Sequence, residues 1–514
     1  MPGKAPKVAK LIKAVLAIHT EILRQEAAAE GIIAQVDPLY RESARNFIRY
    51  LALRTFNLKD VQEQLSCLGL SSIGHSERYT LANIENILYY LHLVQGDTFS
   101  PRYFPGQHPI NYFTSQQLLN THTNRLFGKS TQSNKTRIMV TLPGVAADDE
   151  DLIPNLIGVG MDIARINCSH DNPEVWASMI ARVKKENTKK QRGCLIYMDL
   201  SGPKIRTGAV AIPSQKKKGK KTRDALTLHT GDILRLYRDN RPAAAATLDK
   251  QGQVRKPARI GITLPPAIEN ARAGDRIWFD DGAIGGLITA AYKKYLEVQI
   301  VRAQPAGSKV KGEKGINLPD TYLDLPSLTE EDEQNLPFIA QHADMVGYSF
   351  VRTPEDVAAL QTKLAQLNRQ DIGLVLKIEN NDAFNNLPAL LLAAMKSPGI
   401  GVMIARGDLA VELGAERISE VQEQLMWLCE AAHVPVIWAT QVLESMAKTG
   451  VATRAEITDA SMSGRAECVM LNKGPFILET VQVLKNILGR MDAHQQKKSD
   501  TLRSLNVAKQ FFNP

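Results

Sequence analysis

From Arg137 onward, short apolar runs of strand length alternate with helical patterns, and this alternation constrains the fold more than any other feature of the chain. Repeated strand–helix units predict a parallel sheet covered by helices. Eight such units predict a closed (β/α)8 barrel. The runs are RIMVTL (137–142), DIARIN (162–167), CLIYMDL (194–200), DMVGYSF (344–350), LVLKIEN (374–380), GVMIARGD (401–408), VPVIWATQ (434–441) and CVMLN (468–472).

Two segments do not follow this alternation. Residues 1–130 repeat apolar residues at three- and four-residue intervals, which predicts an all-α accessory or oligomerisation domain. The gap between the third and fourth runs is too long for one crossover helix. Residues 209–312 within it are rich in β-forming residues and turn signals, so we predict a small inserted β-domain. The expected α/β organisation is an N-terminal domain (1–130), a TIM barrel (131–208 and 313–495), an insertion (209–312) and a C-terminal tail (496–514).

Composition narrows the class of protein. Hydrophobic residues make up 44% and charged residues 23% of 514, which is ordinary globular usage, and no apolar stretch is long enough to predict a membrane helix. The net charge of +9 arises partly from QKKKGKKTR (215–223), which lacks interleaved aromatic residues and therefore favours a solvated loop over a nucleic-acid surface. The five cysteines have no paired spacing, so we expect reduced thiols in a cytoplasmic protein.

Polar residues stand at the ends of five of the eight apolar runs. Active residues of a parallel barrel lie at the C-terminal ends of its strands, so these side chains should meet at one mouth. Lys377 and Glu379 are two apart in a strand and should both point inward. The other residues are Arg165, Asn167, Ser169 and His170 at the end of the second run, Asp199, Lys204 and Arg206 at the end of the third, Arg406 and Asp408 at the end of the sixth, and Thr440 at the end of the seventh.

The residue types in this group indicate a chemistry. Glu379 and Asp408 are hard oxygen ligands without a histidine or thiolate companion, which favours Mg²⁺ or Mn²⁺. Arg165, Arg206 and Lys377 would supply fixed positive charge for phosphate oxygens. Phosphoryl transfer depends on such positioning and charge neutralisation, so the pattern fits that class of reaction.

Residues from about 135 to 495 resemble the pyruvate kinase family. The segments that carry the resemblance occur in the family's order: GMDIARINCSH, MDLSGPKIRTG, IWFDDGAI, KGINLPDTYLDLPSLTEED, DMVGYSFVRTPEDV, KIEN, ARGDLAVELG and ATQVLESMAKTGVATRAEITD. The resemblance implies a TIM barrel with an inserted small β-barrel that closes over the site as a lid domain. It also implies transfer of the phosphoryl group of phosphoenolpyruvate to ADP, giving pyruvate and ATP. We expect a homo-oligomer that binds neither nucleic acid nor membrane.

The resemblance implies roles for individual residues. Lys377 corresponds to the lysine that bridges the transferred phosphoryl group and the developing enolate, and Thr440 to the residue beside the enolate face that is protonated. The remaining roles are metal binding for Glu379 and Asp408, phosphate contact for Arg165, substrate-carboxylate binding for the backbone of Ala405, Arg406 and Gly407, and nucleotide-phosphate contact for Asn167, His170, Arg206 and Lys314.

A monovalent-cation site is also implied. Its matching positions are Asn167, Ser169, Asp199 and Leu200. Potassium-dependent members have glutamate where this chain has Lys204, and a lysine ammonium can supply the charge that K⁺ would otherwise provide. The resemblance therefore predicts activity that does not require K⁺.

The chain departs from the family pattern in three places. The first strand continues TLPGVAADD in place of TIGPAS, the eighth continues LNKGPF in place of SGETA, and we expect no counterpart to the usual C-terminal domain. Two alternatives to the kinase stay open. A Mg²⁺-dependent oxo-acid lyase or aldolase of the same barrel type would also use a Glu–Asp metal pair. A non-catalytic homologue would bind phosphometabolites or a protein partner.

Overall fold

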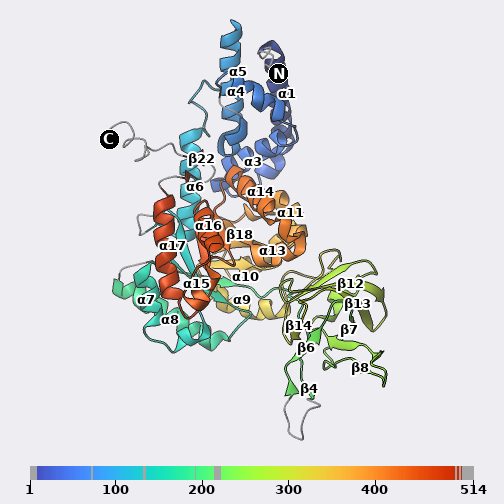
Figure 1. Ribbon diagram of the computed structural model, residues 1–514. Coiled ribbons are helices and arrows are strands. Elements are labelled where there is room, and N and C mark those ends of the chain that lie inside the picture. The colour runs from blue at the N-terminus through green and yellow to red at the C-terminus, as the bar shows by residue number, and fades with distance from the viewer. Residues whose placement is uncertain are drawn as a thin grey trace, which may run out of the picture.

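The computed structural model describes residues 8–70, 73–130, 135–190, 193–213, 222–323, 325–492, 495–496 and 499–500. Most of the basic run 215–223 and of the predicted tail 496–514 therefore lies outside the described residues. Figure 1 shows the N-terminal helices at one end of the molecule, the barrel in the middle and the inserted β-strands at the far side of the barrel.

Eight parallel strands follow one another around a closed barrel, and β20 completes it by pairing with β1. Each strand begins within two residues of a predicted run, but several end earlier because the polar ends belong to loops or helix starts. The strands are β1 (Arg137–Thr141), β2 (Ile163–Asn167), β3 (Leu195–Asp199), β16 (Met345–Tyr348), β17 (Gly373–Ile378), β18 (Ile400–Ala405), β19 (Val436–Ala439) and β20 (Cys468–Leu471).

Helices surround the barrel. Thr329, Thr353 and Thr453 each form a capping box with the acidic residue three positions later, which fixes where α9, α10 and α16 begin. The helices are α7 (Leu152–Val159), α8 (Pro173–Lys190), α9 (Glu330–His342), α10 (Pro354–Gln366), α11 (Asn381–Asn385), α12 (Leu387–Ala394), α13 (Arg406–Leu413), α14 (Ile418–Ala431), α15 (Glu444–Thr449), α16 (Arg454–Ser463) and α17 (Ile477–Met491).

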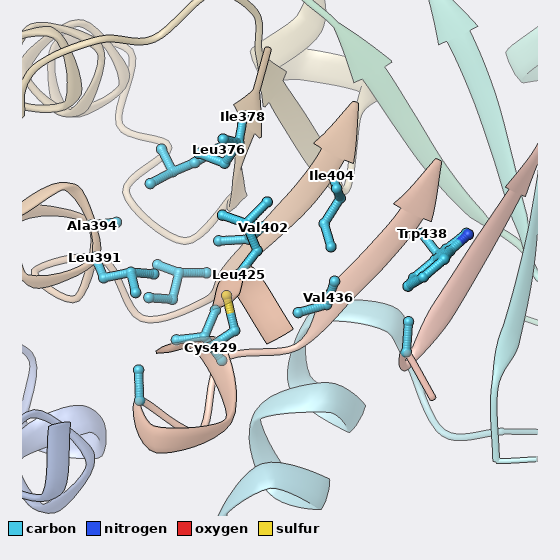
Figure 2. Packing of buried hydrophobic residues seen from close by; sticks show 14 of the residues in the cluster. Leu376, Ile378, Leu391, Ala394, Val402, Ile404, Leu425, Cys429, Val436 and Trp438 are labelled. Carbon is cyan, nitrogen blue, oxygen red and sulfur yellow. The ribbon is translucent and has the colours of Figure 1, made fainter. Parts of the chain in front are cut away.

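Alternate residues of each barrel strand face opposite sides, and this decides which side chains reach the interior. Figure 2 shows the outward set on β17, β18 and β19, where side chains such as Leu376, Val402 and Val436 pack against α12 and α14. The intervening residues, such as Val375 and Met403, belong to a separate cluster inside the barrel. Because Lys377 is two residues after Val375, it points inward, as the sequence predicted.

The inserted β-domain has its own core. Leu234 and Leu236 alternate with partly exposed residues along β7, and they join a cluster made of residues 205–318. A six-stranded mixed sheet runs in the order β10-β7-β13-β12-β11-β15, with β14 paired to β6 beside it. The strands are β4 (Ile212–Pro213), β5 (Thr222–Arg223), β6 (Ala225–Leu228), β7 (Ile233–Tyr237), β8 (Thr247–Leu248), β9 (Val254–Lys256), β10 (Ala258–Gly261), β11 (Arg276–Phe279), β12 (Ile284–Ala291), β13 (Tyr295–Arg302), β14 (Ser308–Lys311) and β15 (Ile316–Asn317).

The N-terminal region is helical, and α1 packs on α3 and α5. Helix α5 ends at Gly96, whose φ of 84° allows a left-handed cap. The helices are α1 (Val8–Ala28), α2 (Glu30–Ile33), α3 (Arg41–Leu53), α4 (Lys59–Cys67), α5 (Thr80–Gln95) and α6 (Tyr112–Phe127). Short 3₁₀ turns are Pro38–Tyr40, Ile73–His75, Glu77–Tyr79, Gly144–Ala147, Pro265–Ile268 and Ala415–Arg417, and two short strands at the end are Gln495–Gln496 and Ser499–Asp500.

The end of α6 enters the bottom of the barrel. Leu126 and Phe127 belong to the same buried cluster as the inward residues of the barrel strands. A methyl group added to Gly373 would lie 2.5 Å from Leu126 Cδ1, and one added to Gly401 would lie 2.5 Å from Leu126 Cδ2, so both glycines make room for this side chain. The helical region is therefore packed into the barrel end opposite the strand C-termini.

The predicted fold class is confirmed: an α/β TIM barrel carries an inserted β-domain and an all-α N-terminal region. The residue boundaries that we assign to the domains stay predictions. No helix among the described residues is long and apolar enough to cross a membrane.

Candidate active site

A cavity of about 420 Å³ opens at the C-terminal ends of the barrel strands, between the barrel and the inserted β-domain. Polar side chains from most of the strand ends line it, together with residues of the inserted domain. Twelve predicted site residues reach it: Arg165, Asn167, Ser169, His170, Lys204, Arg206, Lys314, Lys377, Glu379, Ala405, Asp408 and Thr440. The sequence therefore predicted which side chains meet at the mouth, while their roles stay predictions.

Arg165 forms a buried ion pair at the site. Its Nε and Nη2 atoms lie 2.6 and 2.5 Å from Asp199 Oδ2, and its Nη1 donates to Thr141 Oγ1. Burial lowers the pKa of Arg165, but Asp199 together with Tyr197 and Glu379 more than compensates, so the pKa is raised. Tyr197 also donates to Asp199, at 2.7 Å. Asp199 thus holds Arg165 as a fixed cation at the cavity wall.

Lys377 is a second buried cation. Its Nζ donates to Ser349 Oγ at 2.8 Å and lies 3.1 Å from Glu379 Oε1 and 3.6 Å from Asp199 Oδ1. Burial lowers its pKa, but the two carboxylates more than compensate, so the pKa of Lys377 is raised and the ammonium keeps its charge. The cavity floor therefore carries a positive group that cannot move far.

The two predicted metal ligands are each paired with a lysine. Glu379 accepts from the Phe350 amide at 2.7 Å besides contacting Lys377, and Lys204 Nζ lies 3.0 and 3.2 Å from the two oxygens of Asp408. Burial, opposed by Lys377 and assisted by Asp408, raises the pKa of Glu379. The Glu379 and Asp408 carboxylates therefore line the same cavity, and the negative charge of Asp408 disfavours ionisation of Glu379.

This donor set fits a hard divalent cation bound at an open site. Among the described residues, no group of three or more His, Cys, Asp or Glu side chains is placed to hold a metal ion. Glu379 and Asp408 would supply two carboxylate ligands, and Mg²⁺ is commonly held by one or two carboxylates with water and substrate oxygens completing its shell. A cation at Asp408 would take the place of the Lys204 ammonium.

Thr440 follows β19 in a left-handed conformation, with φ of 64°. This region costs a β-branched residue on the order of 1–3 kcal/mol. The Thr440 hydroxyl accepts a hydrogen bond from the Gly407 amide at 2.8 Å. That amide lies in the first turn of α13, where N–H groups have no partner within the helix and favour an anion.

Cations gather on the side of the cavity nearest the inserted domain. Lys314 Nζ lies 2.8 Å from Asp280 Oδ1, and Arg206 donates to the Glu313 carbonyl at 3.0 Å. Burial, followed by the charges of Lys473 and Arg206, lowers the pKa of His170. Asp171, Asp280 and Asp281 line the same cavity, so the cations on this side lie among carboxylates.

Four predicted site residues do not line the cavity. Asp199 and Leu200 are fully buried behind it, and the Asp199 carboxylate is taken by Arg165 and Tyr197. The Arg406 side chain turns away, and the Gly407 amide donates to the Thr440 hydroxyl. The ammonium of Lys204 contacts Asp408, and Lys204 lines the same cavity as Asn167 and Ser169, so the monovalent-cation assignment stays a prediction.

Sequence reasoning missed several residues of the site. Ser349 directly follows the fourth strand and bridges Lys377 and the Leu200 carbonyl, yet a lone serine at this position carries little signal. Asp280 and Asp281 lie in the quoted segment IWFDDGAI, which could have pointed to them. Asn472 and Lys473 belong to the eighth-strand loop, where the chain departs from the family pattern.

The fold and the site define a (β/α)8-barrel protein with an inserted β-domain, whose mouth gathers buried cations and the carboxylates Glu379 and Asp408. Residues 133–478 match the family model described as pyruvate kinase, barrel domain. A protein named pyruvate kinase from Bacillus licheniformis is 31% identical over 382 residues, which cover 73% of this chain and 60% of that protein. The chain belongs to the pyruvate kinase family.

Other relatives are equally distant. Proteins named pyruvate kinase from Geobacillus stearothermophilus and Staphylococcus aureus (strain USA300) are each 31% identical, over 370 and 373 residues. These matches cover 70% and 71% of this chain, and 57% and 58% of the two relatives. The chain thus spans about 60% of the length of the curated relatives it matches.

Proposed function

We propose that this protein is a Mg²⁺-dependent pyruvate kinase, which transfers the phosphoryl group of phosphoenolpyruvate to ADP. The observation that carries the proposal is the position of Lys377, whose ammonium is buried at the cavity floor between Ser349, Asp199 and Glu379. A fixed cation at this point suits a reaction that develops negative charge on transferred phosphoryl oxygens and on an enolate oxygen.

The surrounding residues support distinct tasks. Arg165, held by Asp199, would contact the phosphoryl group, and the first-turn amides of α13 would bind the substrate carboxylate. Glu379 and Asp408 would hold the divalent cation, which when bound supplies charge neutralisation at the phosphoryl oxygens. Phosphoenolpyruvate would therefore lie on the barrel side of the cavity.

The nucleotide would bind on the opposite side. Arg206, Lys314 and His170 line the cavity beside the inserted domain, where the charges of Arg206 and Lys314 and the ring N–H of His170 would favour the phosphates of ADP. Thr440 would stand near the enolate face that receives a proton, and its hydroxyl can relay that proton through water. We also propose that the inserted domain acts as a lid that excludes water.

Potassium independence is part of the proposal. Lys204 replaces the glutamate of the potassium-dependent members, and Leu200 also fits the variant pattern. The Lys204 ammonium lies within the same cavity as Lys377 and Asp408. We expect turnover to persist when K⁺ is exchanged for tetramethylammonium at equal ionic strength. Loss of turnover after the exchange would contradict this part. A cytoplasmic location and a homo-oligomeric state stay predictions.

One assay separates the kinase from its two alternatives. Pyruvate formation from phosphoenolpyruvate is measured with and without ADP and with and without Mg²⁺, for the wild type and Lys377→Met. Turnover that needs both ADP and Mg²⁺ and falls at least about a thousandfold in the variant supports the kinase. Binding without turnover supports the non-catalytic homologue, and release of pyruvate from a larger oxo-acid supports the lyase.

A further inference from the structure

Three residues just after β19 have left-handed backbone conformations. The φ angles of Thr440, Gln441 and Leu443 are 64°, 57° and 48°. None of them is glycine, and such conformations persist only where the surrounding structure holds them. Since Thr440 lines the cavity, the groups that hold this segment also decide where its hydroxyl lies.

The Arg406 side chain holds the backbone at this point. Its Nε donates to the Ala439 carbonyl at 3.0 Å, and its Nη2 donates to the Thr440 carbonyl at 2.5 Å. The guanidinium is stacked over the Trp438 ring, 5.0 Å from the ring centroid, and Arg406 is only 8% exposed. One rigid, planar group therefore fixes two successive carbonyls before and at the strained residue.

Asp459 in turn fixes the guanidinium. Its Oδ2 accepts from Arg406 Nη2 at 2.9 Å, and its Oδ1 accepts from Nη1, which makes a two-pronged ion pair. Such pairs combine charge with a fixed geometry. Asp459 lies on α16 and does not line the cavity, so it cannot touch a substrate bound there.

We propose that Asp459 is a positioning residue for the reaction, acting through Arg406 to hold Thr440 in its left-handed conformation. This inference rests on the proposed function. The conformation places the Thr440 hydroxyl beside the Gly407 amide at the cavity wall. Without Asp459 the guanidinium loses its anchor, the Thr440 hydroxyl loses its fixed position, and the step that depends on this hydroxyl slows more than substrate binding weakens.

The chain offers a matched control. Arg465 and Glu423 form another two-pronged pair, whose side chains are 10% and 32% exposed, against 10% and 26% for Arg406 and Asp459. Neither residue of the control pair lines the cavity. Glu423→Gln thus removes a similar charge from a similar setting without touching the segment that carries Thr440.

Two rates are measured for Asp459→Asn, Asp459→Glu, Glu423→Gln and the wild type. The first is steady-state turnover of phosphoenolpyruvate with ADP and Mg²⁺. The second is exchange of pyruvate methyl protons with D₂O in the presence of Mg²⁺ and ATP, followed by NMR. We expect kcat and the exchange rate to fall about tenfold in Asp459→Asn, with KM for phosphoenolpyruvate changed less than threefold. Asp459→Glu restores most of both rates.

The control decides between positioning and general damage. Glu423→Gln is expected to keep both rates within twofold of the wild type, and equal losses in both Asn and Gln variants would overturn the inference. If Asp459→Asn does not fold, Arg406→Lys is measured in its place, because lysine cannot bond to both backbone carbonyls and to Asp459 at once. Unchanged rates in Arg406→Lys would also overturn the inference. If the wild type makes no pyruvate, the proposed function fails, but a crystal structure of Asp459→Asn still decides the positioning: a positive φ retained at Thr440 would contradict it.

Discussion

Lys204 Nζ lies 3.0 Å from Asp408 Oδ1, so an ammonium from the loop after the third barrel strand neutralises a carboxylate that follows the sixth. The two residues are 204 positions apart in the chain. If Asp408 is a metal ligand, a divalent cation has to compete with Lys204 for it. The ion pair therefore sets part of the affinity of the site for metal.

We predict that Lys204→Met binds Mn²⁺ more tightly than the wild type when no substrate is present. In the wild type, the metal ion must break the partly exposed Lys204–Asp408 ion pair before it can bind Asp408. Without this pair, the affinity for Mn²⁺ should increase by roughly three- to fivefold, or up to about 1 kcal/mol. Electron paramagnetic resonance titration of free Mn²⁺ gives the affinity directly. Lys314→Met, which loses a contact to Asp280 instead, is the control. Weaker or unchanged binding in Lys204→Met would contradict the competition.

The eighth-strand loop should contribute to nucleotide binding. Lys473 lines the cavity beside His170 and Arg206, where phosphate groups of ADP are proposed to lie. We predict that Lys473→Met raises KM for ADP about three- to tenfold with little change in kcat, because it removes attraction felt equally in ground state and transition state. Lys448→Met, on α15 and paired with Glu444, should leave both parameters unchanged. A loss of kcat alone would assign Lys473 to the chemical step.

Glu412 links helix α13 to the inserted domain and should make stability depend on pH. It accepts a hydrogen bond from Asn317 Nδ2 at 3.0 Å. Burial raises its pKa to about 7, with the Asn317 hydrogen bond opposing and Asp408 adding to the effect. The pKa in the unfolded chain is about 4.3. The folded protein therefore binds more protons than the unfolded chain between these two values, and stability from this group is lost as pH rises through 7.

The expected result is that Glu412→Gln stabilises the protein more at pH 8 than at pH 5.5, by up to about 2 kcal/mol. Thermal unfolding of both proteins at the two pH values measures this difference. Glu416→Gln, on the exposed turn after α13, is the control. A Glu412→Gln effect that is larger at pH 5.5 would reverse the sign and contradict the raised pKa.

The contact between α6 and the barrel should couple the helical region to barrel stability. Leu126 is 3% exposed, and a methyl group at Gly401 would lie 2.5 Å from its Cδ2 atom. We predict that Leu126→Ala costs about 2–5 kcal/mol through the cavity it leaves, and that Gly401→Ala costs about 1–3 kcal/mol by overpacking. The double variant should cost clearly less than the sum, as chemical denaturation can measure. Additive losses would mean that the two side chains do not share the space.

Much of the barrel could be predicted because its signals are local. Strand-length apolar runs recur eight times, and the polar residues at their ends converge by geometry, which is why Lys377 and Glu379 were placed correctly relative to one another. Contacts between distant segments had no such signal. Leu126 and Phe127 end an ordinary helical pattern, and nothing in the sequence indicates that they enter the barrel.

The sequence also did not indicate which residues form ion pairs with the charged side chains. Lys204 was expected near the monovalent-cation positions, but the sequence carried no signal for its contact with Asp408, which lies 204 positions further along the chain. Asp459 lies in the middle of a helical pattern, where an aspartate usually marks a solvated face. Only the fold brings it to Arg406.

The proposed phosphoryl transfer is tested most directly by ³¹P NMR of the purified protein with phosphoenolpyruvate, ADP and Mg²⁺. We predict that the phosphoenolpyruvate signal is replaced by the γ-phosphate signal of ATP in equal amount, and that Lys377→Met leaves the spectrum unchanged. An unchanged spectrum with the wild type, or conversion of phosphoenolpyruvate to inorganic phosphate without ATP, would contradict the assignment.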